Sequence, residues 1–310
     1  MTDLQVIIPS MQFYLGTWQV APSDGFWTGQ DIGTSEKVIS LAARLGIRGF
    51  DTAQSYGRGQ AEQTLSKILR RFDQSFLIDT KIMPSTRDVS ELVRASVSRL
   101  GPLAIDCLYL HWPRTGYDTR TFIKQADALK KSGVIRKTGL CNLPLSALRA
   151  LVSEGFHVDR IQRPASLLWT RELDETLSFC RDSGIGIAVY SPTGMGLLSG
   201  KYRSPEDLSD ARKNLFCFDS ECRPAFLKLL DLVSDVAKNN GMSCTKVALS
   251  WVISKNPDIV LIGARNSAQL KENLDVPAVL SSSELSALSS AASELDRCAS
   301  KVNNIFSYDW

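Results

Sequence analysis

Four polar residues with groups suited to proton transfer, Asp51, Tyr56, Lys81 and His111, stand at or just beyond the ends of apolar runs in this 310-residue chain. An unperturbed tyrosine hydroxyl titrates near pH 10 and is a poor proton donor at neutral pH. A neighbouring lysine ammonium would favour the phenolate and so lower the barrier to giving the proton away. A neutral imidazole could meanwhile hydrogen-bond the oxygen of a bound carbonyl.

A lysine inside a protein needs a counter-charge, because an unpaired buried ammonium is costly and tends to lose its proton. Asp51, in the segment GFDTAQSYG, can supply that charge. We therefore interpret Asp51 as the partner of Lys81, and Tyr56 as the residue that moves a proton. Each of these residues taken alone could equally be an ordinary polar strand end with its hydrogen bonds satisfied.

The spacing of these residues indicates how they could come together. Asp51, Lys81, His111 and Cys141 follow one another at intervals of 30 residues, about the length of one strand plus one helix. Several of the nearby runs are continuously apolar, as is typical of parallel strands covered on both faces. The predicted strands lie at 13–18, 47–53, 76–81, 106–111, 135–142, 160–162, 186–191 and 258–264.

Helical periodicity fills the intervals between these strands. The predicted helices lie at 38–45, 61–71, 89–100, 119–132, 145–154, 173–183, 223–240, 243–255 and 267–274. Strands alternating with helices predict an α/β fold, a single (β/α)8 TIM barrel domain over residues 1–310, with the carboxyl ends of all strands on one rim. Residues 4–8 could form an N-terminal β-hairpin with the first strand. A doubly wound open sheet is the alternative, but no GxGxxG sequence follows the early strands.

The rhythm breaks once, between Tyr190 and the last strand, where about 70 residues replace one ordinary unit. We expect an inserted loop and an extra helix in this C-terminal half of the barrel. Substrate choice should depend on this loop at 203–223, on the loops at 19–32 and 113–120, and on the aromatic tail. The tail residues Phe306, Tyr308 and Trp310 could close over the pocket or dock on the barrel wall.

Composition excludes several classes of function. The net charge of +3 comes from 36 basic and 33 acidic residues that are dispersed along the chain, so a nucleic-acid surface is not indicated. No apolar run reaches the roughly 18 residues of a membrane span, and the N-terminus does not resemble a signal peptide. We expect a cytoplasmic protein with no membrane partner. Seven dispersed cysteines predict reduced thiols, and with only His111 and His157 in the chain we expect no metal site.

The order of these motifs resembles that of the aldo-keto reductases. GFDTAQSYG, DTKI, YLHWP and GLCN look like the segments that follow successive strands in that family, and QRPASLL, AVYSPTGMGLLSGKY and LIGARNSAQLKENL look like its cofactor-binding stretches. The resemblance spans about residues 10 to 275. It implies an NADP-dependent oxidoreductase that transfers a hydride between the cofactor and a small-molecule carbonyl. Tyr56 would be the general acid, Lys81 would lower its pKa, Asp51 would hold Lys81, and His111 would orient the substrate oxygen.

The resemblance also implies how the chain would hold NADP(H). Asn142, Gln162 and Cys141 match residues that bind the nicotinamide carboxamide, with Cys141 standing where the family usually has serine, and Tyr190 matches the aromatic residue on which the nicotinamide stacks. Arg265 resembles the partner of the adenosine 2′-phosphate. The full set implied for the cofactor is Gly16, Thr17, Trp18, Asp51, Cys141, Asn142, Gln162, Tyr190, Ser191, Pro192, Gly194, Leu197, Gly200, Lys201, Ile262, Gly263, Ala264, Arg265, Gln269, Glu272 and Asn273.

Trp18 and Trp112 are the expected walls of a substrate pocket that also includes Tyr56 and His111, although either tryptophan could be plain core. Likewise, Tyr190 could be a core residue and Arg265 a solvated charge. Two other functions stay open. A cofactor-sensing module similar to the potassium-channel beta subunits could keep all four polar residues, with a partner protein possible but not indicated. An aldolase or isomerase that uses Lys81 as a Schiff base would need a lysine free of a carboxylate partner.

Overall fold

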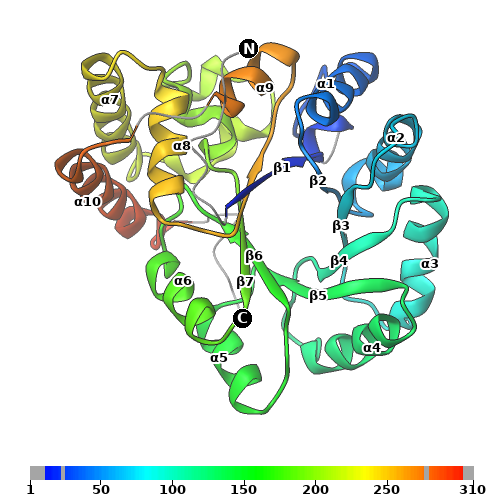
Figure 1. Cartoon of the computed structure of the whole chain (residues 1–310). Coiled ribbons are helices and arrows are strands. Elements are labelled where there is room, and N and C mark those ends of the chain that lie inside the picture. Colours follow the sequence, from blue (N-terminus) through cyan, green and yellow to red (C-terminus); the bar gives the residue numbers. More distant parts are fainter. Residues whose placement is uncertain (1–10, 22–24, 276–278, 303–310) are drawn as a thin grey trace.

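A closed barrel of eight parallel strands forms the centre of the structure, with each strand paired to the next in sequence order (Figure 1). This computed structural model describes residues 11–21, 25–275 and 279–302. The barrel closes where β1 pairs with β8 as well as with β2. The strands are β1 (Gln12–Gly16), β2 (Gly49–Asp51), β3 (Leu77–Ile82), β4 (Ile105–Leu110), β5 (Ile135–Cys141), β6 (Arg160–Pro164), β7 (Gly186–Tyr190) and β8 (Ile259–Ile262). The predicted (β/α)8 barrel and its eight strands are confirmed.

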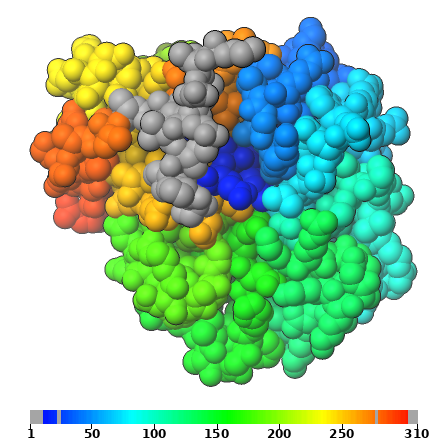
Figure 2. Space-filling view, viewed as in Figure 1, coloured from blue at the N-terminus to red at the C-terminus, as the bar shows by residue number. Residues whose placement is uncertain are grey.

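Amphipathic helices surround the barrel, with their buried residues facing the strands. They are α1 (Ile32–Arg44), α2 (Gln60–Leu69), α3 (Val89–Leu100), α4 (Thr119–Lys131), α5 (Leu145–Ser153), α6 (Leu173–Asp182), α7 (Arg223–Asn239), α8 (Cys244–Ser254), α9 (Ser267–Leu274) and α10 (Ser282–Ala299). The first nine are the predicted helices, and α10 is an addition that the sequence analysis missed. In the space-filling view of Figure 2, the early part of the chain (blue and cyan) and the late part (yellow to red) lie on opposite sides, with the middle part (green) below them.

The long interval after β7 contains the predicted insertion. Four short 3-10 helices come first, followed by α7 and α8, so this unit has two α-helices, where each of the six preceding units has one. Helix α10 packs against α7 on the same side of the barrel (Figure 1). The 3-10 helices here are η3 (Gly194–Ser199), η4 (Pro205–Asp207), η5 (Ala211–Asn214) and η6 (Phe216–Phe218), and two others, η1 (Trp18–Val20) and η2 (Tyr56–Gly59), follow β1 and β2.

Two glycines let large aromatic rings fill the barrel interior. Gly49 on β2 stands opposite Tyr14 on β1, and a Cβ added at Gly49 would lie 2.1 Å from the Tyr14 ring. Gly139 on β5 stands opposite Tyr109 on β4, where an added Cβ would lie 2.4 Å from the ring. The barrel interior is therefore a packed core in which large aromatic side chains lie opposite glycines, as expected for a barrel of this size.

A buried ionic cluster lies below the rim. Asp79 is two residues before Lys81 on β3, so its side chain points to the same face one layer deeper. Arg160 donates to Asp79 (2.8 Å) and to Asp106 (3.4 Å). Burial raises the pKa of Asp79 to about 7, although Arg160 opposes this shift. The cluster joins β3, β4 and β6 through buried charges, and Lys137 of β5 also pairs with Asp106 (3.3 Å).

Two predictions fall on residues that the structure does not describe. The first strand of the predicted N-terminal hairpin, residues 4–8, and the aromatic tail residues Phe306, Tyr308 and Trp310 lie outside the described ranges. Within those ranges, none of the helices is both long and apolar enough to pass through a membrane.

Candidate active site

The strand ends bring Asp51, Tyr56, Lys81 and His111 together. Asp51 is the last residue of β2, Lys81 lies near the end of β3, and His111 directly follows β4. Tyr56 begins η2, just after β2, and its ring centroid lies 5.7 Å from that of His111 and 5.2 Å from the Lys81 ammonium. The interval of 30 residues thus predicted a true spatial cluster on one rim of the barrel.

Lys81 and Asp51 form a buried ion pair, as their spacing predicted. Nζ of Lys81 lies 2.5 Å from Oδ1 of Asp51, and the side chains are 1% and 3% exposed. The ammonium also donates to the Thr52 carbonyl (2.8 Å), and Gln162 donates to the second carboxylate oxygen of Asp51 (2.7 Å). Burial alone would lower the pKa of Lys81, but the Asp51 carboxylate raises it above its usual value. Lys81 is therefore a fixed cation and a poor Schiff-base nucleophile.

The pKa of Tyr56 differs from the sequence expectation. Burial raises the pKa of Tyr56 to about 12, although Lys81 acts to lower it. The expected lowering by Lys81 is present, but the desolvation of the phenolate outweighs it. Tyr56 is therefore fully protonated at neutral pH and has a proton to give, with a cation beside it that stabilises the phenolate as it forms.

His111 is neutral in this environment. Burial, and then the neighbouring Lys81 cation, hold the pKa of His111 well below its usual value. Its Nδ1 lies 3.4 Å from the hydroxyl of Ser55, a residue that the sequence analysis did not single out. A neutral imidazole in contact with a hydroxyl can present its other nitrogen to a carbonyl oxygen near Tyr56.

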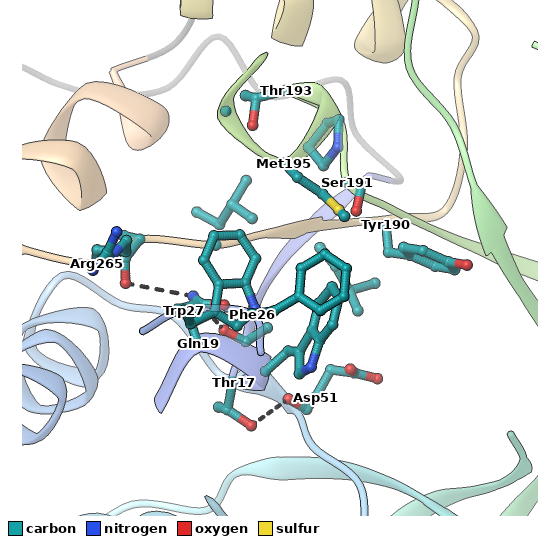
Figure 3. A pocket seen from close by; sticks show the side chains of 18 of the residues that line it. Thr17, Gln19, Phe26, Trp27, Asp51, Tyr190, Ser191, Thr193, Met195 and Arg265 are labelled. Atoms are coloured by element: carbon teal, nitrogen blue, oxygen red, sulfur yellow. Dashed lines mark hydrogen bonds between the residues drawn. The ribbon is translucent and has the colours of Figure 1, made fainter. Parts of the chain in front are cut away.

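A cavity of about 520 Å³ opens along the rim from this cluster to the start of α9. Figure 3 shows Tyr190 and Ser191 at one end and Arg265 at the other, with Phe26 and Trp27 between them in this view. Most of the predicted residues line it: Gly16, Thr17, Trp18, Asp51, Tyr56, His111, Trp112, Asn142, Gln162, Tyr190, Ser191, Pro192, Lys201, Ile262, Gly263, Ala264, Arg265, Gln269, Glu272 and Asn273.

Five predicted residues do not line the cavity. Lys81 is buried behind Tyr56, and Cys141 is fully buried with Cys107 and Tyr109. Burial raises the pKa of the Cys141 thiol well above its usual value, so this side chain is an inert core group. Gly194, Leu197 and Gly200 belong to or follow η3, and the lining of this segment comes instead from Thr193, Met195, Gly196 and Ser199.

The end of the cavity beside the ion pair contains a hydrogen-bonded set of amides. Asn142 donates to the His111 carbonyl (3.1 Å) and accepts from the Tyr190 hydroxyl (2.7 Å). Asn142 has a positive φ of 54°, in the left-handed region that asparagine adopts more readily than most residues. Thr17 donates to the Asp51 carbonyl (2.9 Å, Figure 3) and so fixes the end of β2 against β1.

The opposite end lies between β8 and α9. Asn266 caps α9 by accepting from the Gln269 backbone N–H, and Gln269 in turn accepts from the backbone N–H of Arg265 (2.8 Å). Asn273 donates to the Gly263 carbonyl (3.0 Å), and Glu272 accepts from Ser243 (2.6 Å). The helix N-terminus and the Arg265 side chain both favour an anion at this end.

Aromatic rings form the wall near Tyr56. Trp18 lies 5.0 Å from Phe26, 5.5 Å from Trp27 and 6.3 Å from Tyr56 between ring centroids. Trp112 continues this wall beyond His111 at 6.0 Å. Trp18 and Trp112 are thus pocket walls as well as core neighbours. Of the three loops expected to choose the substrate, residues 113–120 contribute nothing to the cavity lining.

Arg212 is the main lining residue that the sequence analysis missed. It is 5% exposed, makes a paired contact with Asp210 (2.8 and 2.9 Å) and donates to the Met195 carbonyl (2.9 Å). Its guanidinium also lies 5.1 Å from the Trp27 ring centroid. The signal was present in the segment SDARKN, where an aspartate two residues before an arginine can both cap a short helix and pair with it.

A sequence model of the aldo/keto reductase family matches residues 12–293, a range that contains the whole barrel and this cavity. The chain belongs to the aldo/keto reductase family. It is therefore an oxidoreductase of a family that acts on small carbonyl compounds with nicotinamide cofactors.

Two curated relatives give this aldo-keto reductase a functional context. It is 28% identical over 287 residues to the NADH-specific methylglyoxal reductase of Escherichia coli, covering 84% of this chain and 87% of that protein. It is 29% identical over 306 residues to the chloroplastic pyridoxal reductase of Arabidopsis thaliana, covering 91% and 82% respectively. Among solved structures, the glycerol dehydrogenase AKR11B4 from Gluconobacter oxydans superposes with a TM-score of 0.79 at 24% identity, over 95% of this chain and 96% of that one.

Proposed function

We propose that this aldo-keto reductase reduces an aldehyde or ketone to an alcohol with NADPH, and that Tyr56 is the general acid. The observation that carries the proposal is the buried Asp51–Lys81 ion pair beside Tyr56, whose side chain lines a cavity of about 520 Å³.

The protein side of the reaction is a proton transfer. When bound, the nicotinamide cofactor supplies the hydride. Tyr56 then donates its hydroxyl proton to the substrate oxygen, and the Lys81 ammonium stabilises the phenolate that results. Asp51 keeps Lys81 charged and in place, while the neutral His111 hydrogen-bonds the same substrate oxygen and orients it. The surrounding aromatic rings exclude water, which strengthens these electrostatic interactions.

The cavity lining fits a nicotinamide dinucleotide. Its charged residues are Lys201 and Arg265 against Glu272, besides Asp51 and Arg212, which are already paired with Lys81 and Asp210, so the lining suits an anion. The indole Nε1 of Trp27 is buried on this lining and has no hydrogen-bond partner among the described residues. Asn142 and Gln162 would hold the carboxamide, Tyr190 the nicotinamide face, and the segment from Ser191 to Lys201 the pyrophosphate.

We propose NADP(H) rather than NAD(H) because Arg265, at the α9 end of the cavity, offers a cation that could pair with a 2′-phosphate. The Escherichia coli relative is NADH-specific by name, so the preference of this chain has to be measured. For the substrate, the wall of Trp18, Phe26 and Trp112 near Tyr56 carries no charge. A small uncharged carbonyl compound is the class that this wall suits.

The test is the Tyr56→Phe variant. We expect turnover of a panel of aldehydes, followed by NADPH absorbance, to fall by about 10²- to 10⁴-fold, while the Kd for NADP⁺ stays within about twofold of wild type. Tyr117→Phe, a half-exposed tyrosine outside the cavity lining, is the matched control. A Tyr56→Phe variant with wild-type turnover would refute the assignment. Tight cofactor binding without turnover in the wild-type protein would instead support the cofactor-sensing module.

A further inference from the structure

Gln30 touches the predicted phosphate-binding arginine through both atoms of its carboxamide. Nε of Arg265 donates to Oε1 of Gln30 (3.1 Å), and Nε2 of Gln30 donates back to the Arg265 carbonyl (3.2 Å). The two residues are 235 positions apart, on the β1–α1 connection and just after β8. Gln30 thus fixes both the side chain and the backbone of Arg265.

Gln30 is itself held in place. Its Nε2 also donates to the Ser35 hydroxyl (3.1 Å), and that hydroxyl donates to the carbonyl of Val20 (3.2 Å) at the end of η1. Ser35 is buried on α1. The Gln30 carboxamide is therefore held in place by α1 and η1, and it can in turn hold the Arg265 side chain in one orientation.

The hydrogen bonds with Gln30 leave part of the Arg265 guanidinium available for a ligand. Besides Gln30, the Thr28 carbonyl accepts from Nη2 of Arg265 (3.2 Å), and no other hydrogen bond or ion pair to the guanidinium comes from the described residues. Two of the five N–H groups are then used to orient the group, and the other three can meet an anion. Both hydrogen-bond acceptors are neutral, and the nearby Asp210 carboxylate is already paired with Arg212.

From these contacts we propose that Gln30 is a positioning residue that sets the preference of this enzyme for a 2′-phosphorylated cofactor. It acts through Arg265: by ordering the guanidinium in advance, it removes part of the conformational cost of binding the phosphate. A cofactor without that phosphate gains nothing from the ordering. The inference rests on the proposed role of Arg265.

The experiment is isothermal titration calorimetry of the full chain with NADP⁺ and with NAD⁺. We expect Gln30→Leu to raise the Kd for NADP⁺ by about 3- to 10-fold and the Kd for NAD⁺ by less than about twofold. Arg265→Ala should raise the Kd for NADP⁺ by about 10- to 100-fold. Adding Gln30→Leu to Arg265→Ala should then change it by less than about twofold, since the residue through which Gln30 acts is gone.

Two further variants complete the design. Gln30→Glu keeps the acceptor for Arg265 but places a negative charge near the phosphate, so it should weaken NADP⁺ binding more than Gln30→Leu does. Gln74→Leu is the matched control, because Gln74 is partly buried and donates to the Ala43 carbonyl of α1, outside the cavity lining. Thermal unfolding of every variant checks that the loop change has not unfolded the protein.

Two results would overturn the role of Gln30 while leaving the phosphate site intact. One is an equal loss of affinity for NADP⁺ and NAD⁺ in Gln30→Leu, and the other is the same Gln30→Leu effect in the Arg265→Ala background. If Arg265→Ala leaves the affinity for NADP⁺ unchanged, the proposed phosphate site itself is wrong, and the role of Gln30 is refuted with it.

Discussion

Removal of Lys81 should reduce both stability and turnover, and the two losses can be separated. In Lys81→Met the Asp51 carboxylate stays buried without its cation, at 3% side-chain exposure. Breaking a buried pair in this way costs about 3–5 kcal/mol. The carboxylate keeps the hydrogen bond from Gln162 (2.7 Å), so we expect the lower end, about 3 kcal/mol.

The double variant Asp51→Asn/Lys81→Met removes both charges and leaves a neutral, similarly sized pair. Its free energy of unfolding should recover to within about 1–2 kcal/mol of wild type, because no unpaired charge remains in the barrel. Turnover should not recover. Without Lys81 the phenolate of Tyr56 loses its cation, so both variants should show a drop in kcat of about 10²- to 10⁴-fold.

The assay combines urea unfolding with steady-state carbonyl reduction on the same three proteins. A recovery of turnover in parallel with stability would mean that Lys81 serves only to hold the barrel together. A loss of less than about 1 kcal/mol in Lys81→Met would mean that the pair is hydrated in solution and not the buried ion pair described above.

Two other predictions concern the pH dependence of stability and the packing of the barrel. His111 becomes protonated in the unfolded chain below about pH 6.5, while the folded state keeps it neutral. The free energy of unfolding should therefore decrease as the pH falls below that value, by up to about 1.4 kcal/mol per pH unit. Urea unfolding at about pH 7 and pH 5.5 should show a smaller decrease in the free energy of unfolding for His111→Gln than for wild type. Gly49→Ala would place a Cβ 2.1 Å from the Tyr14 ring and should lower the free energy of unfolding, measured in urea, by about 3 kcal/mol or more.

The barrel could be predicted from the sequence because its signals are local and repeated. Each strand is an apolar run, each helix has an amphipathic stripe, and the interval of 30 residues gives the register of the rim. Helix α10 was missed because it follows the repeat and has no strand after it. Its signal was nevertheless present, since Ser281 and Glu284 form a capping box immediately before the apolar positions of the helix.

The site was predicted where one strand end supplies one functional residue, and missed where a contact joins distant loops. Asp51, Lys81 and His111 could be read from their positions in the repeat. Gln30 could not, because it lies in an irregular segment whose path across the rim has no periodicity. Its role depends on Arg265, which is 235 positions away, and no local pattern encodes such a pairing.

The pKa of Tyr56 is a second property that the sequence could predict only in part. The sequence identifies the neighbours of the phenol and therefore the sign of each interaction, with Lys81 lowering its pKa and Asp51 raising it. It does not give the depth of burial, which is the largest influence and raises the pKa to about 12. The distinction matters for the chemistry. A buried, protonated tyrosine next to a fixed cation holds its proton until charge develops on the substrate oxygen, so the group works as an acid in reduction and needs Lys81 most at the moment of transfer.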